Sequence, residues 1–481
     1  MKRTVKLIGA VILCALLFAT LSLSALANSA VTTYGGIDGI SPIVIDGNTP
    51  LCVEKELLTF DIETFPESWY RYPEQGADYG SSVTAEYTVY NPTDSDQTAR
   101  LLFPFGAAPT YMETETVGEV LKNEKYGIEL FGERVEGTVR HTYAPFFGYD
   151  DFNIEKELSK LSDDYIDDGF FSPSLTVTKY TYEVKEAKFG FDDLAEGTFN
   201  INDKSGDRMY FLPDHSWYFT NDDGSAELGA WVDELGQEIE LFILGDPLAD
   251  PLKWQFYLGE KKTGGRLELI STEKTTFEEF ALKEWSENSG ISRVDMFNAV
   301  VAEAKDSAAS YEQNIISIRS YVYGLDDYSL LQWYDYRITV PAGERVVNSV
   351  CAPIFPLIDE GYTPPIYEYS YLLSPAETWK DFGELEIVIN TPHYLVGKSS
   401  AAFSKTDGGY TAKLSGLPEK ELVFALSSSP DPESPMEFFE DLFSADNLLL
   451  ALPIIGVVGM LIGGIVIVIV AKSRNKEGKN K

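Results

Sequence analysis

Histidine, cysteine and basic residues are scarce in this 481-residue chain, and each scarcity excludes a kind of site. Three histidines and three cysteines, without a CxxC pair or a histidine cluster, provide no ligand set for a structural zinc ion. Lys and Arg number 38 against 76 Asp and Glu, and the formal net charge is −38. Because nucleic-acid binders need basic side chains to displace phosphate counterions, we expect no nucleic acid among the partners.

Signatures of catalysis are missing as well. The chain has no GxSxG elbow and no HExxH helix. Lys262-Thr263-Gly264 and Ser271 to Lys274 match the KTG and SxxK elements of penicillin-recognising enzymes, but in reversed order. We attribute that match to chance. The numerous acids would allow the carboxylate pair of a glycosidase, although spacing selects no pair. The sequence therefore predicts no catalysis, with an envelope carbohydrate-active enzyme as the alternative.

Two apolar segments predict the topology. Residues 1–27 combine a basic start, an apolar run and the cleavage signal Ala25-Leu26-Ala27, as in a signal peptide. Residues 448–471 are free of charge and, as a helix, are long enough to cross the roughly 30 Å hydrocarbon core of a bilayer. The basic tail at 472–481 is expected in the cytoplasm. The prediction is a single-pass type I membrane protein with an extracellular ectodomain.

Gly459 and Gly463 lie four residues apart within the predicted membrane helix. Small residues at this spacing let two membrane helices approach closely. We therefore expect the helix to associate with a second copy or with a partner membrane protein, although glycine is also common in membrane helices generally.

Period-two alternation dominates the predicted ectodomain. Ser82 to Tyr90 places Val83, Ala85, Tyr87 and Val89 on one face, and a polar turn follows. Short strands with such turns favour antiparallel sandwiches. The predicted fold is mainly β, with two antiparallel β-sandwich-like modules at residues 28–265 and 266–426.

Three other segments interrupt or follow these modules. Residues 111–171 read as a helical and acidic insertion into the first module. Residues 292–306 read as a leading helix of the second, because Ser292 to Asp295 resembles a capping box and apolar residues follow at intervals of four. Residues 427–447 read as a stalk.

A disulfide and a calcium site are both candidates in the ectodomain. Cys52 and Cys351 are its only cysteines, and an exported protein allows them to form a disulfide. The acidic loops offer oxygen ligands for calcium, although none fits the EF-hand pattern and ordinary acidic turns explain each loop. No other cofactor is expected. The candidate calcium ligands are Asp163, Asp164, Asp168, Asp203, Asp207, Asp222 and Asp223.

Aromatic residues raise the question of sugar stacking. Most of the 28 tyrosines and seven tryptophans occupy alternating strand positions, where core packing explains them. Trp69 to Tyr72 (WYRY) lies in an expected loop and is the best exposed candidate.

Residues 50–62, 83–105 and 369–392 resemble uncharacterised surface proteins of Gram-positive bacteria (PLCVEKELLTFDI, VTAEYTVYNPTDSDQTARLLFPF and YSYLLSPAETWKDFGELEIVINTP). The resemblance implies an exported β-sandwich ectodomain and one C-terminal transmembrane helix, and it supplies no active-site residue. We therefore expect a membrane-anchored binding or structural protein of the cell envelope, with an extracellular ligand that the sequence does not identify.

Overall fold

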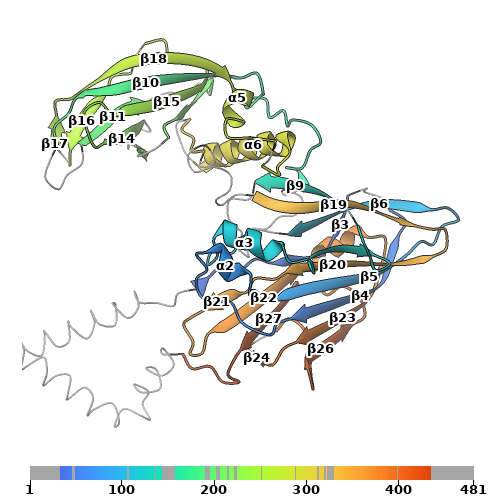
Figure 1. Cartoon of the computed structure of the whole chain (residues 1–481). Helices are drawn as coiled ribbons and strands as arrows, with labels where there is room; N and C mark the ends of the chain where they lie inside the picture. The colour runs from blue at the N-terminus through green and yellow to red at the C-terminus, as the bar shows by residue number, and fades with distance from the viewer. Residues whose placement is uncertain are drawn as a thin grey trace, which may run out of the picture.

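The chain forms two lobes (Figure 1). Residues 33–143 and 330–434 build the first, here called the split lobe because it uses both ends of the described chain. Residues 171–321 build the second, the inserted lobe. The computed structural model describes residues 33–434 except 46–48, 106–107, 136, 144–155, 157, 190–194, 202–205, 214–215, 221–224, 251, 260, 288, 311–313, 319–320, 322–329 and 398.

The split lobe contains an eight-stranded sheet as its largest layer. Its strands, in spatial order, are β25 (Ser404–Thr406), β26 (Gly409–Leu414), β23 (Phe382–Asn390), β4 (Cys52–Asp61), β5 (Ser82–Tyr90), β20 (Arg345–Pro353), β7 (Gly127–Leu130) and β8 (Glu133–Arg134). The predicted alternation in β5 is confirmed, since Val83, Ala85, Tyr87 and Val89 are all buried.

Two smaller sheets complete the split lobe. One contains β1 (Thr33–Tyr34), β21 (Leu357–Asp359), β22 (Ile366–Leu372), β27 (Leu422–Ser427), β24 (Tyr394–Val396) and β2 (Gly39–Ile40). The other contains β3 (Ile43–Val44), β6 (Gln97–Phe105), β19 (Leu330–Val340) and β9 (Thr138–Tyr143). The helical segments of this lobe are α2 (Pro73–Gly76), α3 (Thr114–Leu121) and the 3-10 helix η1 (Ser374–Thr378). Apolar side chains from all three sheets form one continuous core.

The inserted lobe is a two-sheet sandwich with helices against one sheet. The first sheet has the order β12 (Arg208–Phe211), β15 (Glu238–Gly245), β10 (Thr176–Glu186) and β18 (Arg266–Thr276). The second has the order β13 (Ser216–Thr220), β14 (Ala226–Val232), β11 (Ala195–Ile201), β16 (Gln255–Leu258) and β17 (Lys261–Thr263). The helices are α5 (Phe277–Ala281) and α6 (Arg293–Ser310).

The predicted helix at 292–306 corresponds to α6, which packs with α5 against the first sheet of the inserted lobe. Met296, Val300 and Ala304 are buried, as their spacing of four predicted. The Ser292 hydroxyl accepts a hydrogen bond from the Asp295 backbone N–H at 3.0 Å, which is half of the expected capping box. The carboxylate of Asp295 does not complete the box, because it binds an arginine of the split lobe.

The mainly β, antiparallel fold is confirmed, but two of its pairings are parallel: β4 with β23, and β2 with β22. The division at residue 265 is wrong. Strands β19, β20 and β23 pair with β6, β5 and β4, respectively, across that division, and the division itself falls between β17 and β18 of the inserted lobe. Alternation predicts which face of a strand is buried, but it does not predict which other strand it pairs with.

The expected insertion at 111–171 contains α3, β7, β8 and β9, and so contributes edge strands to two sheets of the split lobe. At the other end of the chain, the first stalk residues run beside the split lobe, where Glu433 and Thr363 exchange backbone hydrogen bonds of 2.8 and 3.0 Å.

No helix within the described part of the chain is long and apolar enough to cross a membrane. The signal peptide (1–27), most of the stalk, the membrane helix (448–471) with Gly459 and Gly463, and the tail (472–481) lie outside the described residues. These remain predictions from sequence.

Candidate functional site

The two ectodomain cysteines are both free thiols, so the disulfide that the sequence allows is not formed. Cys52 lies opposite Tyr90 at one end of β5, and Cys351 lies opposite Thr84. Six positions along a strand correspond to about 20 Å, whereas a disulfide needs Cα atoms within about 7 Å. Burial raises the pKa of both thiols.

The predicted calcium ligands do not converge in the described residues, where no three His, Cys, Asp or Glu side chains are placed to hold a metal ion. Asp163 pairs with Arg140 at 2.8 Å and Asp168 pairs with Lys305 at 3.0 Å. These carboxylates are therefore already neutralised by protein cations. Asp164 lies beside Asp163, and Asp207 lies in the inserted lobe. The candidates outside the described residues are Asp203, Asp222 and Asp223.

The WYRY segment does expose aromatic rings. Trp69 and Tyr72 are 41% and 58% exposed, and the Arg71 guanidinium lies 5.8 Å from the centre of the Trp69 ring. Tyr70 between them is buried and accepts a hydrogen bond from the Glu67 backbone N–H at 3.0 Å. The buried tyrosine divides the exposed rings, so the segment forms no continuous platform.

A larger aromatic surface lies on the solvent side of the sheet that contains β13 and β14. Inward side chains of these strands, such as Leu228 and Ala230, belong to the sandwich core. Alternation therefore places their neighbours on the outside. We call this surface the aromatic face. Its aromatic members are Trp217, Phe219, Trp231 and Tyr257.

Trp217 packs against a glycine on this face. It lies opposite Gly229 of β14, and a Cβ added to that glycine would meet the indole at 2.6 Å. The glycine thus lets one side of the ring rest against the strand, and the Trp217 side chain is half-buried. The Trp231 ring is centred 6.5 Å away at an angle of 48°, and Phe219 on the edge strand is 59% exposed. The two indoles form a shallow, angled surface.

Polar groups accompany these rings. Glu196 lies opposite Trp231, and Glu227 lies opposite Phe219. The buried Thr198 hydroxyl donates to Oε1 of Glu227 at 2.5 Å, which fixes that carboxylate. Burial raises the pKa of Glu196, and the negative charge of Glu227 raises it further. The face therefore combines apolar rings with hydrogen-bond acceptors.

A cavity of about 310 Å³ adjoins the aromatic face, and Trp231 belongs to both. The remaining walls come mainly from the turn between β14 and β15 and from the start of β15. Gln237 shapes this turn: its side chain accepts from the Asp233 backbone N–H at 2.7 Å and donates to the Trp231 carbonyl at 3.1 Å. The acidic residues of the wall are Asp233, Glu234, Glu238 and Glu240.

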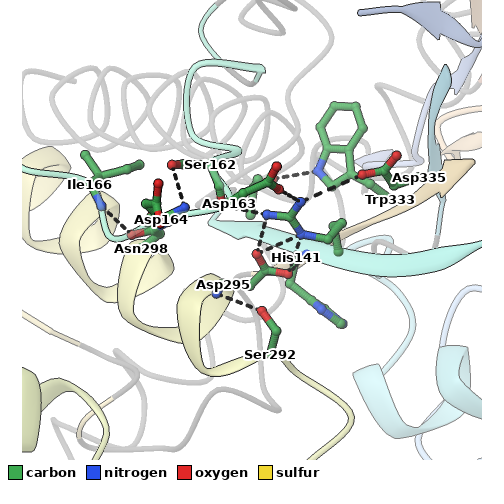
Figure 2. A network of polar contacts seen from close by, with 12 residues as sticks. His141, Ser162, Asp163, Asp164, Ile166, Ser292, Asp295, Asn298, Trp333 and Asp335 are labelled. Carbon is green, nitrogen blue, oxygen red and sulfur yellow. Dashed lines mark hydrogen bonds and ion pairs between the residues drawn. The ribbon is translucent and has the colours of Figure 1, made fainter. Parts of the chain in front are cut away.

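A second polar cluster joins the two lobes (Figure 2). Arg140 on β9 of the split lobe donates from Nε and Nη2 to Asp295 on α6 of the inserted lobe, at 3.0 and 2.9 Å to Oδ1. Asp295 Oδ2 also accepts from the His141 backbone N–H at 3.0 Å. The two charged side chains are only 9% and 2% exposed. We call this ion pair the joint.

Further contacts surround the joint. Arg140 Nη1 lies 2.8 Å from Asp163 and 3.8 Å from Asp335, and its Nη2 donates to the Ser162 carbonyl at 2.7 Å. Asp335 also pairs with Arg100. Burial lowers the pKa of the His141 imidazole, which favours its neutral form beside this network. The contacts hold β9, α6 and the 162–163 loop in one arrangement, and they contain no group placed for substrate chemistry.

The split lobe holds an unusual polar row inside its core. Glu56, Tyr87 and Asn348 lie side by side on β4, β5 and β20, and each is fully buried. The Tyr87 hydroxyl donates to Glu56 at 2.6 Å, and Asn348 donates to the Tyr336 hydroxyl at 3.0 Å. Burial raises the pKa of Glu56 to about 8, although the bond from Tyr87 lowers it.

Sequence reasoning missed both the aromatic face and this polar row. A usable signal for the face was the pair Trp217 and Phe219 two positions apart, followed by Gly229 and Trp231 at the same spacing. Alternation showed that each pair shares a face, and it did not show which face points outward.

Comparison with known proteins adds little to this geometry. No protein-family model matches the chain, and no curated protein matches it. A solved structure from Legionella pneumophila, described as a "putative nutrient binding protein", overlaps 82% of this chain and 72% of its own, with 11% sequence identity and a TM-score of 0.27. A likeness at that TM-score says nothing about the function of this chain.

Proposed function

We propose that this protein is a membrane-anchored, extracellular binding protein of the bacterial cell envelope, and that its binding surface is the aromatic face of the inserted lobe. The observation that carries the proposal is that the half-buried rings of Trp217 and Trp231 and the exposed ring of Phe219 share one outer sheet surface. Tryptophan and tyrosine are favoured where a protein contacts a ligand, because each offers a large rigid surface at low entropic cost.

The chemistry of the face favours a carbohydrate ligand. Flat indole rings can stack on the apolar side of a pyranose ring, while carboxylates such as Glu196 and Glu227 accept hydrogen bonds from sugar hydroxyls. The surrounding negative charge opposes nucleic acid, which also stacks on aromatic rings but needs basic residues along its backbone.

The predicted topology places this face outside the cell. The signal peptide, the membrane helix and the basic tail, together with the resemblance to Gram-positive surface proteins, support an anchored ectodomain. The last described residues leave from the split lobe at Ser434, so the anchor would be attached there. On this proposal the split lobe supports the inserted lobe and does not itself bind the ligand.

One observation favours a second candidate function, that of a glycosidase. Glu196 and Glu227 share the aromatic face, and the pKa of Glu196 is raised, as a general acid requires. Hydrolysis would release reducing sugar ends from bound polysaccharide, and Glu196→Gln would abolish that release while leaving binding intact. Binding without release of reducing ends is the expected result.

Co-sedimentation with insoluble cell-wall polysaccharide tests the proposal. The full chain in detergent should sediment with the polysaccharide, and the variant Trp217→Ala/Trp231→Ala should lose at least about tenfold in affinity, as for central aromatic contacts elsewhere. The matched control is Trp69→Ala/Tyr72→Ala, which removes two exposed rings from the split lobe. Equal sedimentation of wild type and the Trp217/Trp231 variant, or loss in the control, would overturn the proposal.

A further inference from the structure

The chain leaves the split lobe close to the WYRY segment. Glu433 exchanges backbone hydrogen bonds with Thr363 in the turn between β21 and β22, and Ser434 is the last described residue. Four positions after Thr363, the Tyr367 ring stacks on the Phe65 ring with their centres 3.9 Å apart. Four residues of chain span at most about 14 Å. The segment that leads from Phe65 into WYRY therefore begins beside the point where the chain leaves the lobe.

The WYRY segment is held on this side of the lobe by buried contacts. Tyr70 belongs to a buried cluster that also contains Ile358 of β21. The Gln75 side chain of α2 accepts hydrogen bonds from the backbone N–H groups of Arg71 and Tyr72 at 2.7 and 3.1 Å. The exposed side chains of the segment thus project from a fixed backbone, so little conformational entropy is lost when they bind a partner.

The exposed side chains have the chemistry of a membrane interface. Trp69 and Tyr72 are both exposed, and the Arg71 guanidinium lies against the Trp69 ring. Tryptophan and tyrosine concentrate at the headgroup level of bilayers, because each ring combines an apolar body with a polar end. A guanidinium can bind the lipid phosphate beside them.

The local charge indicates which of these attractions dominates. Glu67 and Glu74 are exposed on either side of Arg71, so two acids accompany one base. Net charge would therefore not draw the segment to a lipid surface. The contact would depend on the two rings, and it should persist at high salt, which screens exposed charges.

The length of chain beyond Ser434 favours the same orientation. Residues 435–447 lie between Ser434 and the predicted membrane helix at 448–471. They reach at most about 50 Å at full extension, and a globular lobe of this size is roughly 45 Å across. The side of the split lobe where the chain leaves is therefore the side that we expect to face the bilayer.

We propose that Trp69, Arg71 and Tyr72 contact the headgroup region of the bilayer that holds the predicted anchor, so that the split lobe rests on the membrane at this side. This inference rests on the membrane anchoring in the proposed function and adds a second membrane contact to it. The aromatic face belongs to the other lobe and takes no part in this contact.

Quenching of tryptophan fluorescence by brominated lipids tests the contact. None of the seven tryptophans lies within the predicted membrane helix, so anchoring alone places no indole in the bilayer. The full chain is reconstituted into vesicles of phosphatidylglycerol and phosphatidylethanolamine, either unlabelled or brominated near the carboxyl end of the acyl chains. Brominated vesicles should quench the wild type at low and at high salt, and Trp69→Phe should lose most of this quenching.

Two further variants sharpen the result. The matched control is Trp285→Phe, which removes a half-buried indole from the inserted lobe and should leave the quenching unchanged. Arg71→Ser/Tyr72→Ser keeps the Trp69 indole but removes its neighbours, and should reduce the quenching. Thermal melting of each variant reports whether it is folded.

Flotation of the vesicles separates the contact from the anchor. A chain that floats with the vesicles but is quenched equally with and without Trp69, or is not quenched at all, overturns the contact and leaves the anchor intact. Loss of quenching in Trp285→Phe, or in wild type at high salt, also contradicts a contact through these rings. Failure to float overturns the anchor and the contact together. Sedimentation with polysaccharide in detergent tests the aromatic face independently of all these results.

Discussion

The two lobes place their unusual residues on opposite sides of their sheets. The split lobe buries a polar row, Glu56, Tyr87 and Asn348, inside its core, whereas the inserted lobe leaves Trp217 and Trp231 half-buried on its outer surface. Burying polar groups costs free energy unless they are bonded to one another. Exposing large rings likewise forgoes the stability that their burial would provide.

This difference separates two roles. A buried hydrogen-bonded row fixes how β4, β5 and β20 align, which is of use in a support. An exposed aromatic surface does nothing for stability and is of use in binding. The joint between Arg140 and Asp295 then determines how the binding lobe is held on its support.

The largest effect is expected from Glu56→Gln in the split lobe. The folded-state pKa, about 8, is above the ordinary value of 4.5. The contribution of protonated Glu56 to stability is therefore fully present below pH 4.5. It is lost as the pH rises toward 8, because in that range only the unfolded state releases the proton. At about 1.4 kcal/mol per pH unit, the substitution should stabilise the protein by up to about 5 kcal/mol at pH 8.

Chemical denaturation between pH 4 and pH 9 measures this effect. The control is Glu386→Gln on neighbouring β23, where hydrogen bonds from Lys55 and Lys413 lower the carboxylate pKa. That change should be destabilising at neutral pH and smaller than about 1 kcal/mol, because the pair is partly exposed. A pH profile of Glu56→Gln parallel to wild type would refute a buried, protonated Glu56.

The next effect concerns the joint. Asp295→Ala leaves the buried Arg140 charge without its main partner and should cost about 3–5 kcal/mol of unfolding free energy. The expected calorimetric result is a lower first transition, in which the lobes unfold separately. The control, Glu278→Gln, breaks the partly exposed pair with Arg293 at the start of α6 and should cost less than about 1 kcal/mol. Equal costs for the two variants would show that the joint does not couple the lobes.

A smaller effect on stability is expected on the aromatic face. Trp217→Ala should cost about 1 kcal/mol or less, because the ring is only half-buried, even though it should abolish most binding. The fully buried Trp333 of the split lobe provides the contrast, since Trp333→Ala should cost about 3–5 kcal/mol. If the two substitutions were equally costly in urea denaturation, Trp217 would be a core residue.

The smallest effect is expected from the cysteines. Cys52→Ser and Cys351→Ser should each change the unfolding free energy by less than about 1 kcal/mol, and the full chain should migrate identically with and without reductant on denaturing gels. A mobility shift that disappears in either variant would mean that the thiols do pair.

Local patterns predicted much of the fold. The alternation in β5 and β23 and the spacing in α6 corresponded to buried faces, because each depends only on neighbouring residues. The parallel pairing of β4 with β23 joins segments about 330 positions apart, and no local pattern encodes such a partner. The division of the chain into lobes was missed for the same reason.

Glu56 illustrates a different limit. Its neighbours Lys55 and Glu54 are charged, so the sequence suggests an exposed stretch of strand. The β4–β5 register shifts between Val53 and Lys55, and this irregularity lets Val53 and Glu56, three positions apart, both be buried. One residue of shift exchanges the faces of a strand, and alternation alone does not locate such a shift.

Hydrogen-exchange mass spectrometry of the full chain, with and without soluble fragments of cell-wall polysaccharide, tests most directly whether binding belongs to the inserted lobe alone. The account predicts added protection in peptides that cover β13, β14 and the turn at 233–237, and unchanged exchange throughout the split lobe. Protection centred on Trp69 and Tyr72, or on any strand of the split lobe, would contradict it.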